Sequence, residues 1–334
     1  MFYSPIYKQP KFDFIFVTKP NQFNLPKIKT PLKWLDNSID IRQNIKKWHK
    51  TSKALIIVGI TYARKPNKLA YNKYYLRISE YSALRDYHKV IYDKLKNLLK
   101  IIKRSIKDLK PAYNLKKLDC KIFVDSSPVY EKGYFLAGLQ AYLGKNSLLL
   151  SNIGSKFLIG GISLNIALSI LQKILNNKRI FLYETKNLNL DKYSNKPKYL
   201  CTQCNLCITK CPTGAINSNG FKINIPLCIS YLTVESKGII PEFLQKRMKN
   251  WLFGCDECQN TCPYNKKYQL TLNKNELQLR FGKILPTIIY FRQAKGFSYH
   301  GFYKYFAGTP VIRMGYIKFK NRVVTYIKQS LLKR

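Results

Sequence analysis

The chain has 334 residues, 46% of them hydrophobic, so it is long enough to bury a sizeable core in one or two domains. No apolar run reaches the roughly 18 residues of a membrane span, and the first 31 residues lack the continuous apolar core of a signal peptide. The net charge of +42 favours a polyanionic partner such as nucleic acid, although an A+T-rich coding sequence would explain part of it. We therefore expect a cytoplasmic protein without a membrane partner.

The first elements in chain order are an irregular segment, a strand and a long helix. Residues 1–50 contain five prolines and predict an irregular N-terminal segment that packs on the body. Residues 54–62 are apolar and β-branched, as in a buried strand. From Asp86 an amphipathic helix is expected, ending at Pro111. The apolar residues that set its spacing are Ile91, Leu95, Leu98, Ile102 and Ile106.

Further strands and helices are expected up to the cysteine-rich stretch. In order they are a strand at 121–125, a helix from about 130 to 143, a turn at 144–146, and strands at 147–151 and 157–168. The end of the last segment, near 165–176, fits a helix equally well. This β-α-β-α order predicts an α/β (α+β) fold, with a mixed-sheet domain over residues 51–190.

Eight of the nine cysteines lie between residues 201 and 262. The first four have the spacing C-x2-C-x2-C-x3-C-P, which is the bacterial pattern for 4Fe–4S ligation. Eight thiolates can hold two such clusters. Two structural zinc sites could also use eight thiolates, but they would normally show separate C-x2-C pairs. Disulfide bonds explain the eight cysteines less well than zinc sites do, because the chain is long and shows no export signal.

The spacing also predicts how the two clusters share their ligands. In two-cluster ferredoxins the fourth cysteine of a run ligates the other cluster. Cluster 1 is then expected to use Cys201, Cys204, Cys207 and Cys262. Cluster 2 is expected to use Cys211, Cys228, Cys255 and Cys258.

One cysteine departs from the pattern of a plain ferredoxin. Cys228 stands far upstream of Cys255, so residues 229–254 must loop out, where we expect them to contact a substrate or a second cofactor. We place a ferredoxin-like double 4Fe–4S domain at residues 191–270, after a polar linker at 186–199. Residues 271–334 predict a basic, helical C-terminal region that packs on the body.

Asp125 is the acidic residue best placed for chemistry. It ends a predicted strand, and α/β folds bind ligands at the carboxyl ends of strands. Partial burial there would raise its pKa and make it a proton donor, although an Asx turn or a helix cap is the plain alternative. Glu131 is expected in the first turn of the next helix, and His88 in the first turn of the long helix. Cys120 is expected to be a buried, inert thiol.

The box Cys-Ile-Ser-Tyr-Leu-Thr at 228–233 and the widely split second cysteine run are not features of generic ferredoxins. Together with the segments at 212–216, 254–259 and 262–265, they resemble the epoxyqueuosine reductase family. Matching segments outside the cysteine stretch occur in the same order: 85–90, 124–126, 144–146, 306–310 and Arg313. The chain is similar to the short form of the family.

This resemblance implies reduction of epoxyqueuosine to queuosine at the wobble position of tRNA anticodons, the last step of queuosine biosynthesis. It implies that an external one-electron donor, such as flavodoxin or ferredoxin, feeds two 4Fe–4S clusters and then cobalamin. Residues 51–190 would form the cobalamin-binding domain, and we expect a monomer. Asp125 falls at the family's proton-donor position, and Lys237 is a candidate tRNA contact. The candidate cobalamin contacts are Arg42, Asp125, Leu149, Ile159, Ser230 and Asp256.

Two alternatives from other classes stay open. One is a corrinoid and iron–sulfur reductive dehalogenase-like reductase, a class that usually carries an export signal. The other is a ferredoxin-type electron carrier, which would not need the long α/β region ahead of the cysteines.

Overall fold

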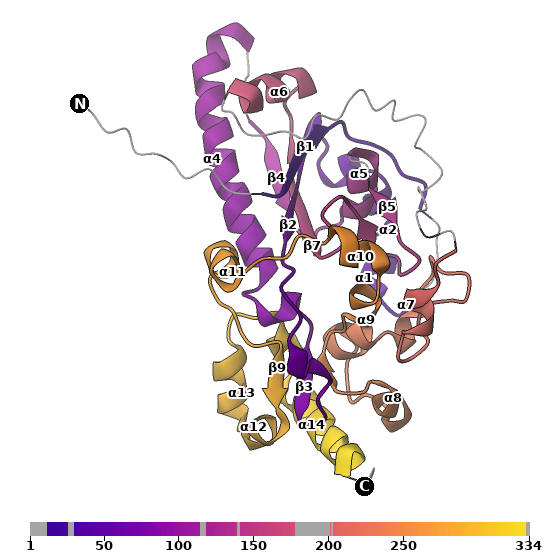
Figure 1. Cartoon of the computed structure of the whole chain (residues 1–334). Coiled ribbons are helices and arrows are strands. Elements are labelled where there is room, and N and C mark those ends of the chain that lie inside the picture. The colour runs from indigo at the N-terminus through magenta and orange to yellow at the C-terminus, as the bar shows by residue number, and fades with distance from the viewer. Residues whose placement is uncertain are drawn as a thin grey trace, which may run out of the picture.

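The computed structural model describes residues 12–25, 30–113, 118–138, 141–177, 201 and 203–331. These residues form a four-stranded sheet, a three-stranded sheet and a two-stranded ribbon, with helices packed around them (Figure 1). The strands are β1 (Phe14–Thr18), β2 (Ala54–Thr61), β3 (Tyr75–Ile78), β4 (Cys120–Phe123), β5 (Tyr142–Leu143), β6 (Leu149–Leu150), β7 (Phe157–Leu164), β8 (Trp251–Phe253) and β9 (Ile288–Tyr290). The α/β class expected from the sequence is confirmed.

The four-stranded sheet has the order β1-β2-β7-β4, and every neighbouring pair in it is antiparallel. All eight residues of β2 are buried, because helices cover both faces of the sheet. Ile56 and Val58 pack toward α4 (Tyr87–Tyr113) and α6 (Leu168–Asn177). Leu55 and Ile57 pack toward α5 (Glu131–Gly138), on the opposite side in Figure 1. This two-sided burial explains why the strand is apolar along its whole length.

The leading segment is more regular than its prolines suggested. It supplies the edge strand β1, which pairs with β2 from Phe14↔Gly59 to Thr18↔Leu55. Phe14 and Phe16 face the core on the α5 side, and Ile15 and Val17 face the core on the α4 side. Three short helices follow: α1 (Lys33–Asp36), α2 (Ile39–Gln43) and α3 (Ile45–Trp48). The prediction of an irregular segment over residues 1–50 is therefore wrong for this part.

Several predicted ends of helices and strands shift in the structure. Helix α4 runs two residues beyond Pro111, to Tyr113. The alternative of a helix after β7 is confirmed by α6. Helix α5 ends at Gly138 rather than at 143, because Tyr142 begins the short β5–β6 ribbon. The predicted linker at 186–199 lies outside the described residues.

The second sheet joins segments that are far apart in the sequence. Strand β3 pairs in parallel with β8 and antiparallel with β9, so the order is β8-β3-β9. Its core also contains apolar residues of the C-terminal helices, which lie beside β3 and β9 in Figure 1. These helices are α12 (Phe291–Gly296), α13 (Tyr299–Phe306), the 3-10 helix η6 (Pro310–Met314) and α14 (Tyr316–Leu331). Helix α11 (Lys274–Phe281) instead packs with Leu277 and Phe281 in the core on the α4 side of the first sheet.

The cysteine-rich stretch consists of short helices and turns beside the second sheet. Its elements are α7 (Leu206–Thr209), η4 (Ile225–Leu227), the π-helical turn η5 (Tyr231–Glu235), α8 (Glu242–Arg247), α9 (Glu257–Asn260) and α10 (Pro263–Tyr268). Within the described part of the chain, none of the helices has the length and apolar character needed to cross a bilayer.

Candidate active site

The eight cysteine thiols of the 201–262 stretch form two electrostatic groups. Burial, followed by the neighbouring thiols of Cys201, Cys262 and Cys204, raises the pKa of Cys207 to about 11. In the second group, burial raises the thiol pKa values of Cys228, Cys255 and Cys258. Cys211 adds to the shift at Cys228, Cys258 adds to that at Cys255, and Cys228 adds to that at Cys258. Cys207 of the first group also adds to the shift at Cys258, and the division of ligands expected from the spacing stays a prediction.

The chemistry of these thiols fits two iron–sulfur clusters. Sulfurs that repel one another as thiolates are stabilised by a metal centre that binds only the deprotonated form. Backbone N–H groups also point at the sulfurs: that of Ala215 donates to Cys211 Sγ at 3.2 Å. Others hydrogen-bond Cys228, from Ser230 and Tyr231, and Cys262, from Tyr264 and Asn265. Such bonds are typical around cluster ligands. Among the described residues no three His, Cys, Asp or Glu side chains converge on a site for a single metal ion.

Asp125 lies two residues beyond the end of β4 in a strained backbone conformation. Its φ of +46° is in the left-handed region, which residues other than glycine seldom adopt. Its N–H donates to Glu131 Oε1 at 2.7 Å, and its Oδ2 accepts from the Tyr87 hydroxyl at 2.5 Å. The Asp125 side chain nevertheless remains 53% exposed. Strain of this kind tends to occur at functional sites, so the conformation supports a role beyond a turn.

His88 forms an ion pair with Asp125 from the first turn of α4. Its Nε2 lies 3.3 Å from Asp125 Oδ2, and its Nδ1 lies 2.7 Å from Asp86 Oδ1. The Tyr87 ring stacks on the imidazole with 4.1 Å between centroids. The histidine is thus held between two carboxylates, one on each ring nitrogen.

The pKa values at this site differ from the expectation that burial would make Asp125 an acid. Burial does favour a higher pKa for Asp125, but hydrogen bonds from His88 and Tyr87 outweigh it, so the pKa is lowered. Burial opposes the charge on His88, but hydrogen bonds and charges from Asp125 and Asp86 raise its pKa to about 9. Burial, with the nearby Asp125 charge, raises the pKa of Glu131 to about 8. At neutral pH the protons therefore reside on His88 and Glu131, and the expected raised pKa of Asp125 is wrong.

The loop after Cys228 and the Asp125 site meet through the C-terminal region. Arg313 in η6 forms an ion pair with Glu235 in η5, with 3.4 Å between Nη2 and Oε1. The charge of Arg313 also lowers the pKa of Asp125. Arg313 therefore lies close to both the strand end that bears Asp125 and the segment that loops out of the cysteine stretch. The expectation that this segment contacts a substrate or a second cofactor stays a prediction.

Helix α14 binds the backbone of this looped-out segment through two basic side chains. The Arg322 side chain is fully buried, and its guanidinium donates to the backbone carbonyls of Trp251 at 3.0 Å, Gln245 at 3.4 Å and Lys249. Lys318 Nζ donates to the Ser236 carbonyl at 2.7 Å. Both cations bind carbonyl groups, so they fix the backbone of the segment.

The candidate cobalamin contacts differ in their burial and in their hydrogen-bond partners. Arg42, on α2, lies near enough to Glu131 and Asp125 to feel their charges, and its Nη1 donates to the Val129 carbonyl at 2.9 Å. Ile159 on β7 is partly buried against the core on the α5 side. The Ser230 hydroxyl hydrogen-bonds Cys228. Leu149, on β6, is only 5% exposed.

Asp256 is the candidate whose side chain fits a ligand contact least well. It is 2% exposed, and its Oδ2 accepts from the Glu80 N–H at 2.8 Å. Burial, followed by the charge of Glu80, raises its pKa. Glu80 in turn binds Lys156 Nζ at 2.6 Å. Asp256 therefore belongs to a buried network with Glu80 and Lys156, and its backbone carbonyl accepts the N–H groups of Gln259 and Asn260. Lys237 is exposed in the loop after η5.

Sequence reasoning placed His88 on the first turn of α4 but gave it no role. The segment 85–90 already belonged to the family resemblance, and it contains an acid, a tyrosine and a histidine in a row. That row, together with a predicted strand ending on Asp125, could have indicated that His88 lies beside Asp125. Glu131 was placed correctly in the first turn of α5, but its bond to the Asp125 backbone was not expected.

Two family models match the chain in the regions just described. The model "Epoxyqueuosine reductase QueG, DUF1730" matches residues 42–126, which end at the Asp125 site. The model "4Fe-4S double cluster binding domain" matches residues 200–265. An epoxyqueuosine reductase of Francisella cf. novicida is 30% identical over 319 residues, covering 89% of this chain and 78% of the relative. The chain belongs to the epoxyqueuosine reductase family.

Other epoxyqueuosine reductases match over a smaller part of their length. The Cyclobacterium marinum enzyme is 32% identical over 234 residues, which are 70% of this chain and 65% of the relative. The Escherichia coli enzyme is 30% identical over 247 residues, which are 74% of this chain and 55% of the relative. This chain thus matches less than two thirds of the length of these two relatives.

Solved epoxyqueuosine reductases share the fold. The Streptococcus thermophilus structure aligns with a TM-score of 0.69 over 96% of this chain and 79% of its own, at 21% identity. A crystal structure of an epoxyqueuosine reductase with an epoxyqueuosine-modified tRNA stem loop aligns with a TM-score of 0.70 over 97% and 79%, at 20% identity. The likeness therefore extends across both sheets and the cysteine stretch.

Proposed function

We propose that this chain reduces epoxyqueuosine to queuosine in the anticodon of tRNA. The observation that carries the proposal is the meeting of Asp125 and His88 with the segment that loops out after Cys228, linked by Arg313. The proposed reaction requires a proton-holding group beside a redox module. Removal of an epoxide oxygen needs both, because an epoxide, two electrons and two protons give an alkene and water.

The cysteine thiols are proposed to hold two 4Fe–4S clusters. The first set is Cys201, Cys204, Cys207 and Cys262, and the second is Cys211, Cys228, Cys255 and Cys258. The electrostatic grouping of the thiols supports this division. A basic surface suits an acidic one-electron donor such as flavodoxin or ferredoxin, which we propose as the external reductant. We also propose that the chain acts as a monomer.

Cobalamin is proposed to bind at the seam between the first sheet and residues 229–254. When bound, cobalamin supplies a low-valent, nucleophilic cobalt, and the clusters supply single electrons. The residues proposed to hold it through their side chains are Arg42, Asp125, Ile159 and Ser230, while Leu149 and Asp256 would contact it through their backbone. The accessible Asp125 carboxylate and the polar and apolar groups around it suit a ligand with amide groups on an apolar ring.

His88 and Asp125 are proposed to deliver a proton to the leaving epoxide oxygen. His88 holds its proton at neutral pH and lies against Asp125 Oδ2, while Asp125 is the more exposed of the two side chains. A proton can therefore pass from His88 through Asp125 to the oxygen. Tyr87 keeps the carboxylate oriented, because its hydroxyl binds the same oxygen that faces His88.

The tRNA partner is proposed from charge and from the tRNA-bound relative. The net charge of +42 supports binding to phosphate groups, and Lys237 is exposed on the looped-out segment. The protein is proposed to bind the anticodon stem loop across this segment and to present the wobble base to Asp125.

A single-turnover assay tests the proposed function. The protein is purified without oxygen, loaded with cobalamin, reduced, and mixed with tRNA that carries epoxyqueuosine. We expect queuosine in the digested tRNA, with a yield proportional to loaded protein. Complete loading with iron and cobalamin but no queuosine would contradict the proposal.

A further inference from the structure

The turn at residues 144–148, which joins β5 to β6, lies against the cysteine stretch. The Gly144 N–H donates to the Leu148 carbonyl at 2.8 Å, so the turn is closed by a backbone bond. The Phe221 N–H donates to the Lys145 carbonyl at 2.7 Å. The backbone of the turn is therefore fixed on the cysteine stretch.

Two buried side chains of this turn reach the two sets of cysteines. Lys145 is 8% exposed, and its Nζ donates to Asn205 Oδ1 at 2.7 Å. Asn205 lies among the cysteines of the first set. Asn146 is 7% exposed, and its side chain hydrogen-bonds Cys258, which belongs to the second set. A short segment from outside the cysteine stretch thus touches both sets.

The orientation of the Asn146 amide follows from its other hydrogen bond. Its Oδ1 accepts the Leu148 N–H at 3.2 Å, which leaves the Nδ2 hydrogens to face the sulfur of Cys258. A Cβ at Gly144 would lie 2.6 Å from the Asn146 Oδ1, so glycine at this position leaves room for the amide. The side chain is therefore held with an N–H donor toward the sulfur.

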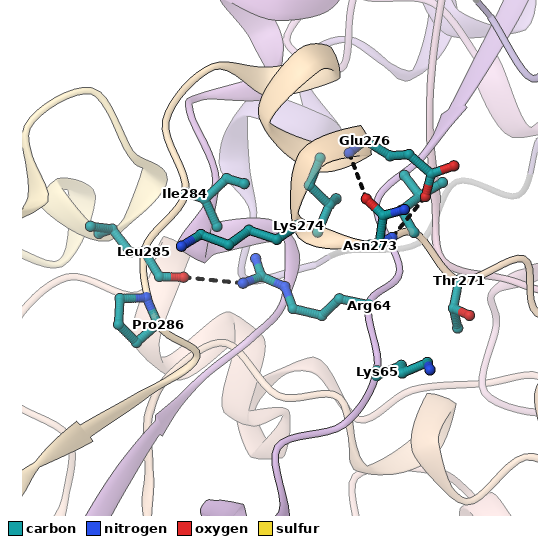
Figure 2. A pocket seen from close by; sticks show the side chains of 11 residues that line it. Arg64, Lys65, Thr271, Asn273, Lys274, Glu276, Ile284, Leu285 and Pro286 are labelled. Atoms are coloured by element: carbon teal, nitrogen blue, oxygen red, sulfur yellow. Dashed lines mark hydrogen bonds between the residues drawn. The ribbon is translucent and has the colours of Figure 1, made fainter.

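Helix α9, which bears the thiol, is held in place by a buried network. Lys156 Nζ donates to Asn260 Oδ1 at 2.7 Å and to Glu80 Oε1 at 2.6 Å. The Glu80 carbonyl accepts from Arg64 Nη2 at 3.0 Å. Arg64 Nη1 donates in turn to the Leu285 carbonyl at 3.1 Å (Figure 2). Since Lys156 precedes β7 and Glu80 follows β3, the helix is fixed relative to both sheets.

An N–H donor at a cluster sulfur favours the reduced form of the cluster. Reduction adds an electron whose charge spreads onto the sulfurs, so a hydrogen bond to a sulfur is stronger in the reduced state. Such a bond raises the reduction potential. Asn146 is neutral, so its effect does not depend on a protonation equilibrium of its own. Because the donor is a side chain, a substitution can remove it without changing the backbone.

We propose that Asn146 raises the reduction potential of the second-set cluster through a hydrogen bond from its Nδ2 to the Cys258 sulfur. The inference rests on the clusters of the proposed function and deepens that function. Electron transfer through this cluster then depends on a residue outside the cysteine stretch.

A redox titration followed by electron paramagnetic resonance tests the effect on the full chain, purified without oxygen and without tRNA. Iron is counted first, and about eight irons per chain are required. Asn146→Leu has a side chain of similar size without a donor. At a fixed potential, its ratio of reduced to oxidised second-set cluster should fall about tenfold, a shift of about 59 mV to lower potential for one electron. The signal of the other cluster should shift little.

Ser147→Ala, in the same turn, is the matched control and should leave both potentials unchanged. Among the described residues, no hydrogen bond joins the Ser147 hydroxyl to a cysteine. If Asn146→Leu loses its clusters, Asn146→Ser replaces it, because serine is common in turns and its hydroxyl ends one bond short of the amide nitrogen. It should shift the same signal in the same direction.

A measurement on the wild type needs no variant to fold. With ¹⁵N in the asparagine side chains, pulsed resonance of the reduced second-set cluster should show hyperfine coupling to a labelled nitrogen. No coupling in the wild type, unchanged potentials in an Asn146 variant with about eight irons, or an equal shift in Ser147→Ala would each overturn the proposal. Fewer irons in the wild type would instead contradict the proposed clusters, and this inference with them.

Discussion

Asp125→Asn tests the proton path most sharply, because the amide keeps the shape of the side chain and removes its acidity. Turnover should fall about 10²–10⁴-fold, the usual contribution of a positioned proton donor. Iron content should not change, since the variant leaves all eight cysteines in place and the Asp125 N–H bond to Glu131 uses the backbone. A carboxamide can still accept the Tyr87 hydroxyl, so the turn should persist.

The same variant should also move the pH dependence of the residual activity. Hydrogen bonds and charges from Asp125 and Asp86 overcome the effect of burial and raise the His88 pKa from 6.5 to about 9. Because this folded-state pKa is raised, the charged form and its ion pairs are fully present below pH 6.5 and are lost as pH rises through about 9. Removing one of two carboxylates should lower the His88 pKa by roughly one unit, which corresponds to about 1.4 kcal/mol.

The measurement is the single-turnover rate between about pH 6 and pH 10 for the wild type, Asp125→Asn and Ser126→Ala. Ser126→Ala is the matched control, because its hydroxyl donates to the neighbouring Val124 carbonyl within the same turn and not to Asp125, His88 or Tyr87. We expect the wild-type rate to fall above the His88 pKa, and the rate of Asp125→Asn to fall at lower pH. Wild-type turnover in Asp125→Asn, or an unchanged alkaline limb, would refute the reasoning and return Asp125 to a structural turn.

Three further results are expected. By iron analysis, anaerobically purified wild-type protein should contain about eight irons per chain, and Cys228→Ser about four. The control Cys120→Ser should keep about eight. About four irons in the wild type would contradict the presence of two clusters. Arg322→Met should lower the free energy of unfolding by about 3 kcal/mol or more in denaturant titrations, because two buried carbonyls and one partly buried carbonyl lose their donor. The exposed Lys328→Met on the same helix should change it little, and equal effects of the two variants would contradict this role of Arg322. The affinity for tRNA should fall steeply with salt, and Lys237→Ala should reduce the slope by about one; a flat salt response would mean that the positive charge does not serve tRNA.

The sequence predicted the parts of this fold that depend on local pattern. The apolar run of β2 and the amphipathic spacing of α4 each follow from burial along a single segment. The double 4Fe–4S domain was predictable because ligand spacing is itself the constraint. Strand β1 was missed, because its neighbouring prolines suggested a loop, while its place in the sheet depends on pairing with β2. The pairing of β3 with β8 and β9 is equally non-local.

The active-site electrostatics could not be read from the sequence for the same reason. The Asp125 pKa depends on His88 and Tyr87, which lie 37 and 38 positions earlier in the chain. From its position alone, partial burial suggested a raised pKa, whereas the two hydrogen bonds lower it. Asp256 shows the converse, because the family resemblance implied a cobalamin contact at this residue. Its side chain instead turns inward to the Glu80 backbone.

The most direct test of the central claim is mass spectrometry of anticodon nucleosides from cells with and without this protein. The tRNA is isolated and digested, and epoxyqueuosine and queuosine are quantified by mass. We predict that cells without the protein accumulate epoxyqueuosine, and that supplying the wild-type chain, but not Asp125→Asn, restores queuosine. Queuosine at the normal level in its absence, with no other epoxyqueuosine reductase in the cell, would contradict the proposed function.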